Sequence, residues 1–322
     1  MKTITLGKSD LLVSPVAFGT WQLGGEWGPV DEASAIAAMH RAIDAGVTLF
    51  DTAQAYGFGT SEQLLGRALQ GHSRSDLVIA TKGGLRPDGA GLVRDASSGW
   101  IRSGVDESLR SLGTDYLDLY QVHWPDPLTP FEETAETLAK LVADGKILHV
   151  GVSNFDAAQI AAFSTVLPVE TLQSPYHLFH RQIEDSVLPQ VAADGIGFLA
   201  YGPLAHGLMG GHLAPTTQFA PGDWRATSVD FRGDIFERNL QVVAALRNLA
   251  ETELGITTAQ LAIAWTLANP AVHVAIVGTR SPDHIDEAVS AADIDLGADV
   301  MGRIDDIMLS ATPIIGPSPE AV

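Results

Sequence analysis

Four side chains in the first part of the chain bring together a carboxylate, a phenol, an ammonium and an imidazole. Asp51 and Tyr56 share the segment Asp51-Thr-Ala-Gln-Ala-Tyr56, and Lys82 and His123 follow. A free phenol has a pKa of about 10, and a nearby ammonium favours its ionised form. Tyr56 beside Lys82 can therefore give a proton to a carbonyl oxygen when hydride reaches the carbon, and take it back in the reverse direction.

The other two groups have supporting roles in this hypothesis. A buried ammonium without a partner tends to lose its proton, so we expect Asp51 to keep Lys82 charged and in place. His123 can donate a hydrogen bond to the carbonyl oxygen and orient it. Each residue alone has a simpler interpretation, as a structural ion pair, a loop aromatic or a satisfied polar group. Only the four residues together indicate a catalytic site.

The candidate residues end short apolar runs, which is the pattern of buried strands that open onto a site. Strands are predicted at Val16–Gly19, Thr48–Asp51, Val78–Lys82, Leu117–His123, Ile147–Ser153, Thr171–Ser174, Phe198–Tyr201 and Val274–Gly278. Helices are predicted between them, for example at Glu32–Ala45, Thr60–Leu69, Trp100–Leu112, Phe131–Ala143 and Ala157–Phe163. Helix caps are predicted at Asp31 and at Thr60 or Ser61, and helix ends at Gly46, Gly113 and Gly145.

Eight strands that alternate with helices predict an α/β fold of the (β/α)8 barrel type, with 1–322 as a single domain. An open doubly wound sheet is the main alternative, but no Gly-x-Gly-x-x-Gly joins a strand to a helix, since Glu62 stands where the third glycine after Gly57 and Gly59 belongs. We expect 2–13 to form an N-terminal β-hairpin over the barrel floor and extra helices near the C-terminal end. Residues 203–234 read as a functional loop, and 312–322 as a frayed tail.

Composition excludes several classes of function. The 322 residues carry a net charge of −20, which disfavours nucleic acid and anionic lipid as partners. The absence of cysteine rules out disulfides, thiolate catalysis and zinc–thiolate sites. His177 and His180 lie three residues apart without further ligands nearby in sequence, so no metal site is expected. The N-terminus has no signal-peptide core and no apolar run is long enough for a bilayer, so we expect a cytoplasmic protein.

Polar or aromatic residues follow nearly every predicted strand, and the active sites of such barrels lie at these strand ends. The motifs there are Phe50-Asp-Thr-Ala-Gln-Ala-Tyr56-Gly, Thr81-Lys-Gly, Gln121-Val-His-Trp124, Gly151-Val-Ser-Asn-Phe155, Gln173, Ala200-Tyr-Gly-Pro-Leu204 and Val277-Gly-Thr-Arg280. In these motifs the chain resembles the aldo-keto reductase superfamily over almost its entire length, in particular bacterial members and the branch of channel β-subunits. The resemblance implies reversible carbonyl reduction with NADP(H) and no metal, and a catalytic tetrad of Asp51, Tyr56, Lys82 and His123.

The resemblance also implies the cofactor site. Ser153, Asn154 and Gln173 match positions that hold the nicotinamide carboxamide, and Tyr201 matches the ring that stacks on nicotinamide. Arg280 matches a 2′-phosphate ligand, which favours NADP(H) over NAD(H). The simpler interpretations are a helix cap for Ser153–Asn154, core packing for Tyr201 and a solvated surface position for Arg280. Further cofactor positions are Gly202, Leu204, Gly278, Thr279, His284 and Glu287.

Three positions depart from the family pattern. Gly202 replaces a common serine, His212 stands where a lysine is frequent, and Ala288 replaces the asparagine that often follows Glu287. These differences affect the expected affinity for the cofactor and leave the tetrad intact.

Substrate residues are predicted from loops at the catalytic face. The aromatic residues Trp21, Trp27, Phe58 and Trp124 form a candidate wall over the substrate, with loop packing as the alternative. The first functional hypothesis is a reductase of aldehydes or ketones. A sugar or polyol dehydrogenase would run the same tetrad backward, and a cofactor-sensing regulatory subunit is the alternative of another class. The intact tetrad favours an enzyme.

Overall fold

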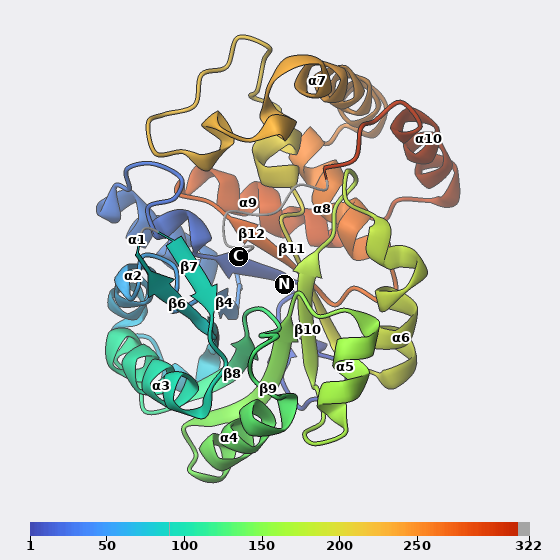
Figure 1. Cartoon of the computed structure of the whole chain (residues 1–322). Coiled ribbons are helices and arrows are strands. Elements are labelled where there is room, and N and C mark those ends of the chain that lie inside the picture. Colours follow the sequence, from blue (N-terminus) through green and yellow to red (C-terminus); the bar gives the residue numbers. More distant parts are fainter. Residues whose placement is uncertain (90, 315–322) are drawn as a thin grey trace.

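Eight parallel strands close into a barrel with helices around its outside (Figure 1). The computed structural model describes residues 1–89 and 91–314. In order around the ring the strands are β3 (Val16–Gly19), β4 (Leu49–Asp51), β5 (Val78–Gly83), β8 (Leu117–Val122), β9 (Ile147–Ser153), β10 (Thr171–Pro175), β11 (Gly197–Tyr201) and β12 (Val274–Gly278). β12 pairs with β3 in parallel and closes the ring. The predicted (β/α)8 barrel is confirmed, and the open sheet is excluded.

All eight predicted strands are present, with ends that differ by about one residue. They are buried almost throughout, because side chains fill the barrel inside and helices cover it outside. The helices around the barrel are α1 (Glu32–Asp44), α2 (Thr60–Leu69), α3 (Ser98–Leu112), α4 (Phe131–Ala143), α5 (Ala157–Ser164), α6 (Val187–Asp194), α8 (Thr258–Ala268) and α9 (Asp283–Ser290). The expected extra C-terminal helices are α7 (Gly233–Asn248), continued by a π-helical turn at Leu249–Leu254, and α10 (Ala298–Met308).

The predicted helix caps are partly confirmed. The Asp31 side chain accepts a hydrogen bond from the N–H of Ala33 at the start of α1. The cap predicted for α2 is wrong, because Gly59 holds that position in a left-handed conformation with φ of 94°. The Ser61 hydroxyl instead donates to the side chain of Thr20, 41 residues earlier. The helix ends are confirmed at positive-φ glycines, Gly46, Gly113 and Gly145.

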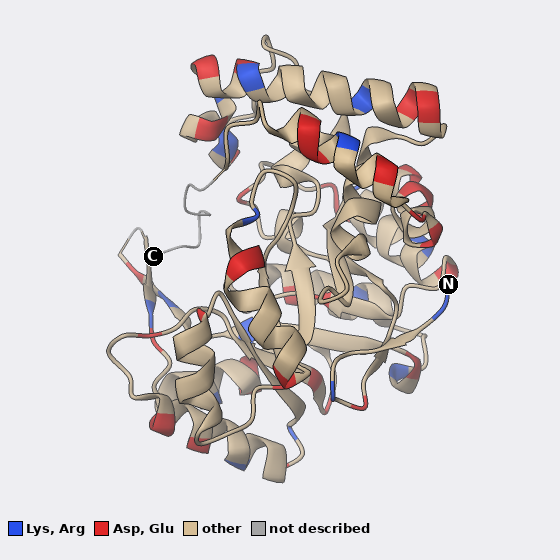
Figure 2. Cartoon of the chain, turned by 90° about the vertical axis from the view of Figure 1, so that its right-hand side faces the viewer, with Lys and Arg blue, Asp and Glu red and all other residues tan. Residues whose placement is uncertain are grey.

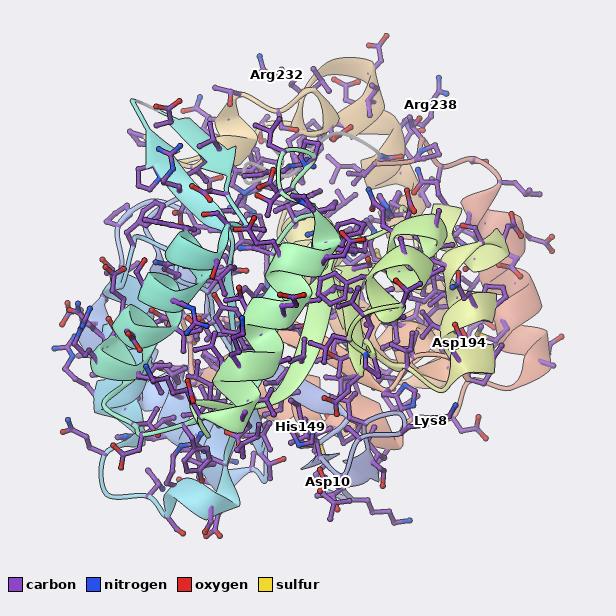
Figure 3. The ribbon with its side chains drawn as sticks, turned by 60° about the horizontal axis from the view of Figure 1, so that its bottom comes forward. Lys8, Asp10, His149, Asp194, Arg232 and Arg238 are labelled. Atoms are coloured by element: carbon purple, nitrogen blue, oxygen red, sulfur yellow. The ribbon has the colours of Figure 1, made fainter. Side chains whose placement is uncertain are left out.

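The predicted N-terminal hairpin is confirmed as the pair β1 (Ile4–Thr5) and β2 (Leu12–Val13). Leu6 and Leu11, from its turn, pack against barrel residues such as Leu49 and Leu199 and close the barrel floor. At this end His149 lies between the carboxylates of Asp10 and Glu170, and Figure 3 shows it far from Arg232 at the other end.

Loops at the opposite, catalytic end contain structure that the sequence reading lacked. A hairpin of β6 (Leu85–Asp88) and β7 (Gly91–Arg94) follows β5. The predicted loop 203–234 contains the short 3-10 helices η4 (Ala205–Gly210), η5 (Trp224–Ala226) and η6 (Val229–Phe231). Short 3-10 helices in other parts of the chain are η1 (Trp21–Leu23), η2 (Arg74–Asp76), η3 (Gln182–Asp185) and η8 (Ala291–Asp293).

The tail that was predicted to fray begins in an ordered conformation. The N–H of Ile314 donates to the carbonyl of Phe179, and Ile314 is buried. Thr312 exchanges hydrogen bonds with the side chain of Asn239. The rest of the predicted tail, 315–322, lies outside the described residues.

Acidic residues are spread over the outer helices, with basic residues between them (Figure 2). This distribution agrees with the net charge of −20. Among the helices of the described ranges, none is long and apolar enough to cross a membrane.

Candidate active site

The four tetrad residues meet at the carboxyl ends of neighbouring strands. Asp51 is the last residue of β4, Lys82 lies near the end of β5, and His123 follows β8 directly. Tyr56 lies in the turn between β4 and α2, where its carbonyl accepts a hydrogen bond from the N–H of Ser61 at 3.2 Å. Parallel strands bring these ends together although the residues span 72 positions from Asp51 to His123.

The ammonium of Lys82 is the centre of the arrangement. Its Nζ lies 2.7 Å from Oδ2 of Asp51, 2.9 Å from the carbonyl oxygen of Thr52 and 3.2 Å from the hydroxyl oxygen of Tyr56. An ammonium has three N–H donors, so these three acceptors use all of them. The side chain is only 1% exposed, and a charge buried to this degree persists where it is paired and hydrogen-bonded.

Asp51 is held from its other side by a residue distant in sequence. The side-chain amide of Gln173, on β10, donates to Oδ1 of Asp51 at 2.8 Å. Both carboxylate oxygens are therefore engaged, one by Lys82 and one by Gln173. Gln173 was predicted only as a cofactor ligand, and its hydrogen bond makes it a positioning residue for the tetrad as well.

His123 is buried at 2% exposure with its ring 5.8 Å from that of Tyr56, centroid to centroid. Burial and the positive charge of Lys82 hold the pKa of His123 well below its usual range, and Asp51 offsets this only in part. His123 is therefore neutral near pH 7. A neutral imidazole has one N–H donor, which suits hydrogen bonding to an oxygen rather than proton donation from a cation.

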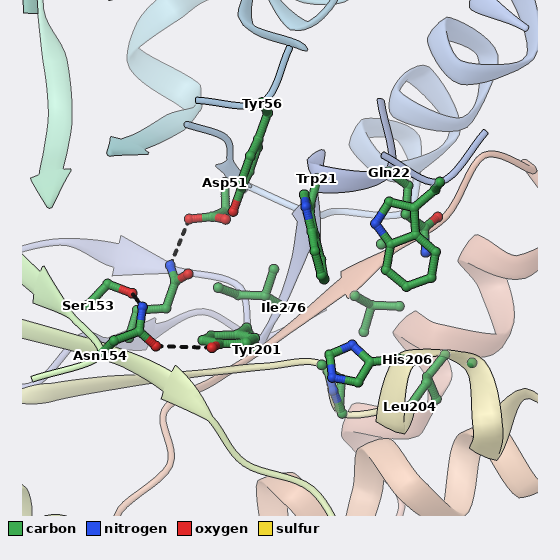
Figure 4. A pocket seen from close by; sticks show the side chains of 18 of the residues that line it. Trp21, Gln22, Asp51, Tyr56, Ser153, Asn154, Tyr201, Leu204, His206 and Ile276 are labelled. Carbon is green, nitrogen blue, oxygen red and sulfur yellow. Dashed lines mark hydrogen bonds between the residues drawn. The ribbon is translucent and has the colours of Figure 1, made fainter. Parts of the chain in front are cut away.

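A cavity of about 790 Å³, including its open mouth, runs along these residues (Figure 4). Asp51, Tyr56 and His123 line one part of the cavity. The other lining residues are Gly19, Trp21, Gln22, Trp27, Ser153, Asn154, Gln173, Tyr201, Gly202, Pro203, Leu204, His206, Gly207, Ile276, Val277 and Gly278.

Three predicted nicotinamide positions share one hydrogen-bond network. The hydroxyl of Tyr201 donates to Oδ1 of Asn154 at 3.0 Å, and the Asn154 amide donates to Oγ of Ser153 and to the carbonyl of His123. The helix-cap interpretation of Ser153–Asn154 is wrong, because Asp156 caps α5 with a complete capping box. Tyr201 lines the cavity and also packs against the core cluster inside the barrel, so both interpretations of this residue stay open.

The remaining predicted cofactor residues follow β12. Gly278 lines the cavity, while Nη1 of Arg280 donates to the carbonyls of Trp27 at 3.4 Å and Pro29 at 3.0 Å. The ring of His284 stacks at 6.3 Å from that of His212, and its Nδ1 lies 3.2 Å from the hydroxyl of Thr279. Glu287 accepts a hydrogen bond from the hydroxyl of Thr257.

The predicted aromatic wall divides into two parts. Trp21 and Trp27 line the cavity with their rings perpendicular, 5.0 Å apart. Phe58 is 41% exposed and Trp124 packs under the guanidinium of Arg94, and neither lines the cavity. The structure therefore brings two of the four predicted substrate residues to the site.

Several residues of the site were missed by sequence reasoning. His206 and Ile276 line the cavity, and Trp224 stacks on Trp21 from the side at 6.2 Å. His206 and Trp224 lie in the long loop 203–234, which was predicted to be functional. The sequence does not indicate which residues of this loop face the cavity. His177 and His180 form a close ring pair at 5.7 Å, and within the described ranges no group of three potential metal ligands was found.

Residues 15–308 match the sequence model of the aldo/keto reductase family. The chain is 41% identical to the aldo-keto reductase YhdN of Bacillus subtilis (strain 168), over 90% of this chain and 88% of that protein. It is 32% identical to the NADH-specific methylglyoxal reductase of Escherichia coli (strain K12), over 92% of this chain and 95% of that protein.

Solved structures are also similar to this chain in fold and in sequence. The structure of a glycerol dehydrogenase from Gluconobacter oxydans superposes with a TM-score of 0.88 at 35% identity, covering 98% of both chains. An aldo-keto reductase from Klebsiella pneumoniae, crystallised with NADPH, superposes with a TM-score of 0.75 at 29% identity, covering 99% of this chain and 98% of that one. With its barrel, its tetrad and a family match over most of its length, the chain belongs to the aldo/keto reductase family.

Proposed function

We propose that the chain is an oxidoreductase that uses NADP(H) to interconvert an aldehyde or ketone and the corresponding alcohol. The observation that carries the proposal is the contact between the buried ammonium of Lys82 and the hydroxyl of Tyr56, at 3.2 Å on the wall of the cavity. The NADPH complex of the Klebsiella pneumoniae relative supports the cofactor. The E. coli relative is named as NADH-specific, so the choice of cofactor needs its own test.

The residues along the cavity fit a nicotinamide dinucleotide. Ser153, Asn154 and Gln173 offer hydroxyl and amide groups, which can both donate to and accept from a carboxamide. Tyr201 offers a ring face beside them. When bound, the reduced cofactor supplies the hydride that goes to the carbonyl carbon.

Tyr56 gives its proton to the carbonyl oxygen in this mechanism. Lys82 stabilises the phenolate that remains, because its ammonium donates to the same oxygen at 3.2 Å. His123 is not the proton source, since its depressed pKa keeps it neutral, and its N–H orients the carbonyl oxygen instead. In the reverse direction the phenolate accepts the alcohol proton, so the same four residues serve oxidation.

The direct test replaces the phenol. We expect Tyr56→Phe to lower kcat by about 10²-fold or more, since general acid catalysis contributes this much, while the Kd for NADPH stays within about threefold. Tyr120→Phe is the matched control, because it removes another buried hydroxyl, from a residue that does not line the cavity. Wild-type kcat in Tyr56→Phe would remove this residue as the acid.

Arg280 is proposed to select NADP(H) through the 2′-phosphate. Its guanidinium has five N–H donors, and its two contacts with the carbonyls of Trp27 and Pro29 both come from Nη1. We expect Arg280→Ala to raise the Kd for NADPH at least tenfold more than the Kd for NADH. Arg303→Ala, an exposed arginine paired with Glu253, is the control. An equal loss for both cofactors contradicts the assignment.

Oxidation of a sugar or polyol is the second candidate, because the Gluconobacter oxydans neighbour is a glycerol dehydrogenase. Cofactor absorbance measured in both directions over aldehydes, ketones, aldoses and polyols separates the two. Tight NADPH binding without turnover on any of these compounds would favour a cofactor-sensing regulatory subunit and overturn the enzymatic proposal.

A further inference from the structure

The segment that follows β11 enters the cavity with an unusual backbone. Ala205 and His206 are consecutive non-glycine residues in the left-handed region, with φ of 47° and 56°. Such conformations cost free energy, and they persist where surrounding contacts enforce them, often at functional sites. Here the guanidinium of Arg225 donates to the carbonyl of His206 at 3.1 Å. The backbone is thus held so that the imidazole of His206 lines the cavity.

Aromatic rings fix the orientation of this imidazole. Its centroid lies 5.1 Å from that of Trp224, 6.0 Å from Trp21 and 5.9 Å from His177, all nearly perpendicular to it. Within the described part of the chain, no side chain or carbonyl forms a hydrogen bond with its two ring nitrogens. A neutral imidazole therefore offers one donor and one acceptor in the cavity wall without a protein partner.

A glycine leaves room for this ring. Gly202 adopts φ of 68°, and a Cβ atom there would lie 3.8 Å from Cε1 of His206 and 3.8 Å from Cδ2 of His177. A larger side chain at residue 202 would therefore extend toward the imidazole. With glycine at this position, no side chain from residue 202 covers the imidazole.

Burial holds His206 neutral while no anion is bound. It is the main cause that lowers the pKa of His206 to about 4, and the neighbouring His180 and Arg225 contribute to the same shift. The groups that face it are His177 and His180 after β10 and Arg225 on η5, whose charge is paired with Asp223 at 2.6 Å. An anion placed against the ring reverses this balance and favours the imidazolium.

The position of His206 identifies the anion. The reacting carbon must lie against Tyr56 and His123, whereas Figure 4 shows His206 across the cavity from Asp51 and Tyr56, beside Leu204. Arg280 donates to the carbonyl of Trp27, whose ring lies 6.4 Å from that of His206, centroid to centroid. A dinucleotide with its nicotinamide at Tyr56 and its 2′-phosphate at Arg280 has its diphosphate between these ends, where His206 stands.

Resting on the proposed function, we propose that His206 binds the diphosphate of NADP(H) through its imidazole N–H and takes up a proton as the cofactor binds. Affinity then rises as the pH falls below the pKa that His206 acquires in the complex. It is independent of pH above that value, where the neutral imidazole still donates one hydrogen bond.

Two variants test the proposal without relying on turnover. His206→Asn suits the left-handed backbone and removes the imidazole, and His206→Phe keeps an aromatic ring but removes its donors. The emission of the nearby tryptophans reports the binding of NADP⁺ and NAD⁺. We expect both variants to raise both Kd values about tenfold, because a hydrogen bond to a charged group is lost. His180→Asn, which alters the same histidine cluster outside the cavity wall, should stay within twofold of wild type.

Proton uptake provides the second measurement. Calorimetric titration with NADP⁺ at pH 6, in buffers that differ in ionisation enthalpy, should show uptake in the wild type and none in either His206 variant. Binding within twofold of wild type in both variants overturns the proposal, and a loss confined to NADP⁺ moves the contact to the 2′-phosphate and refutes the diphosphate assignment. A wild-type chain that binds neither cofactor would instead refute the proposed function itself.

Discussion

Removing the negative charge of Asp51 should destabilise the whole protein as well as the reaction. The Lys82–Asp51 pair is buried, with side chains 1% and 4% exposed and 2.7 Å between Nζ and Oδ2. Asp51→Asn leaves the ammonium buried with only the carbonyl of Thr52 and the hydroxyl of Tyr56 as fixed partners. Breaking a buried pair by removing one charge costs about 3–5 kcal/mol.

This cost translates into a measurable shift. A chain of this length has an unfolding entropy of about 0.7 kcal/mol per kelvin near its Tm, so we expect Asp51→Asn to lower the Tm by about 4–7 °C. Part of the cost is avoided if Lys82 gives up its proton, and then the phenolate of Tyr56 loses its stabilising cation. We therefore expect kcat to fall by at least about tenfold whichever way the cost is divided.

The double variant decides whether the pair is responsible. Lys82→Met alone leaves a buried carboxylate and should cost a similar 3–5 kcal/mol, whereas Asp51→Asn with Lys82→Met leaves no buried charge at this site. The new asparagine can still accept from Gln173, which now donates to Asp51 at 2.8 Å. Urea unfolding of wild type, both single variants and the double variant gives the coupling energy, which we expect to exceed about 2 kcal/mol. Additive losses in the double variant would refute the reasoning.

Three further predictions concern stability. The hydrogen bond to the Glu170 carboxylate raises the pKa of His149. The free energy of unfolding should therefore fall by about 1 kcal/mol or less as the pH rises from about 6.5 through the folded pKa. Urea unfolding at pH 6 and 9 should show this fall in the wild type and not in His149→Gln. Burial raises the pKa of Glu62, so ionisation of this carboxyl costs stability above pH about 4.5. Glu62→Gln keeps an acceptor for the hydroxyl of Thr81 and should have a higher Tm than the wild type at pH 8 but not at pH 4. An unchanged Tm at pH 8 would contradict this prediction. Asp31→Ala removes the cap of α1 and should lower the Tm by about 1–2 °C, whereas Asp31→Asn should keep it.

The barrel and the tetrad could be predicted because both depend on local patterns. Each strand is a short apolar run, and the polar residue that ends it marks the catalytic face. Once the strands are parallel and closed, Asp51, Lys82 and His123 must lie together. The acceptor of the third Lys82 proton, the carbonyl of Thr52, was not predictable, because its direction is set by the turn after β4.

The errors occurred where a distant contact overrides local preference. Ser61 is a good helix cap in isolation, but its hydroxyl is bound to Thr20, and Gly59 takes the cap position instead. The β6–β7 hairpin was missed although a glycine, Gly89 with φ of 61°, directly follows β6, because its four-residue strands include Pro87 and carry a weak alternation. In this case the signal was present in the sequence.

The catalytic end is completed by loops that join over the cavity from distant parts of the chain. Trp27 pairs with Asp223 as an antiparallel bridge, and the guanidinium of Arg225 lies 4.7 Å from the centroid of the Trp27 ring. These contacts span nearly 200 positions, and no local pattern indicates which loop residues will meet. The loops also supply Trp21, Trp27 and His206 to the cavity wall, whereas the strands and the turn after β4 supply the tetrad. The tetrad is therefore encoded locally and could be predicted from the sequence, while the make-up of the cavity wall depends on long-range loop contacts that no local pattern specifies.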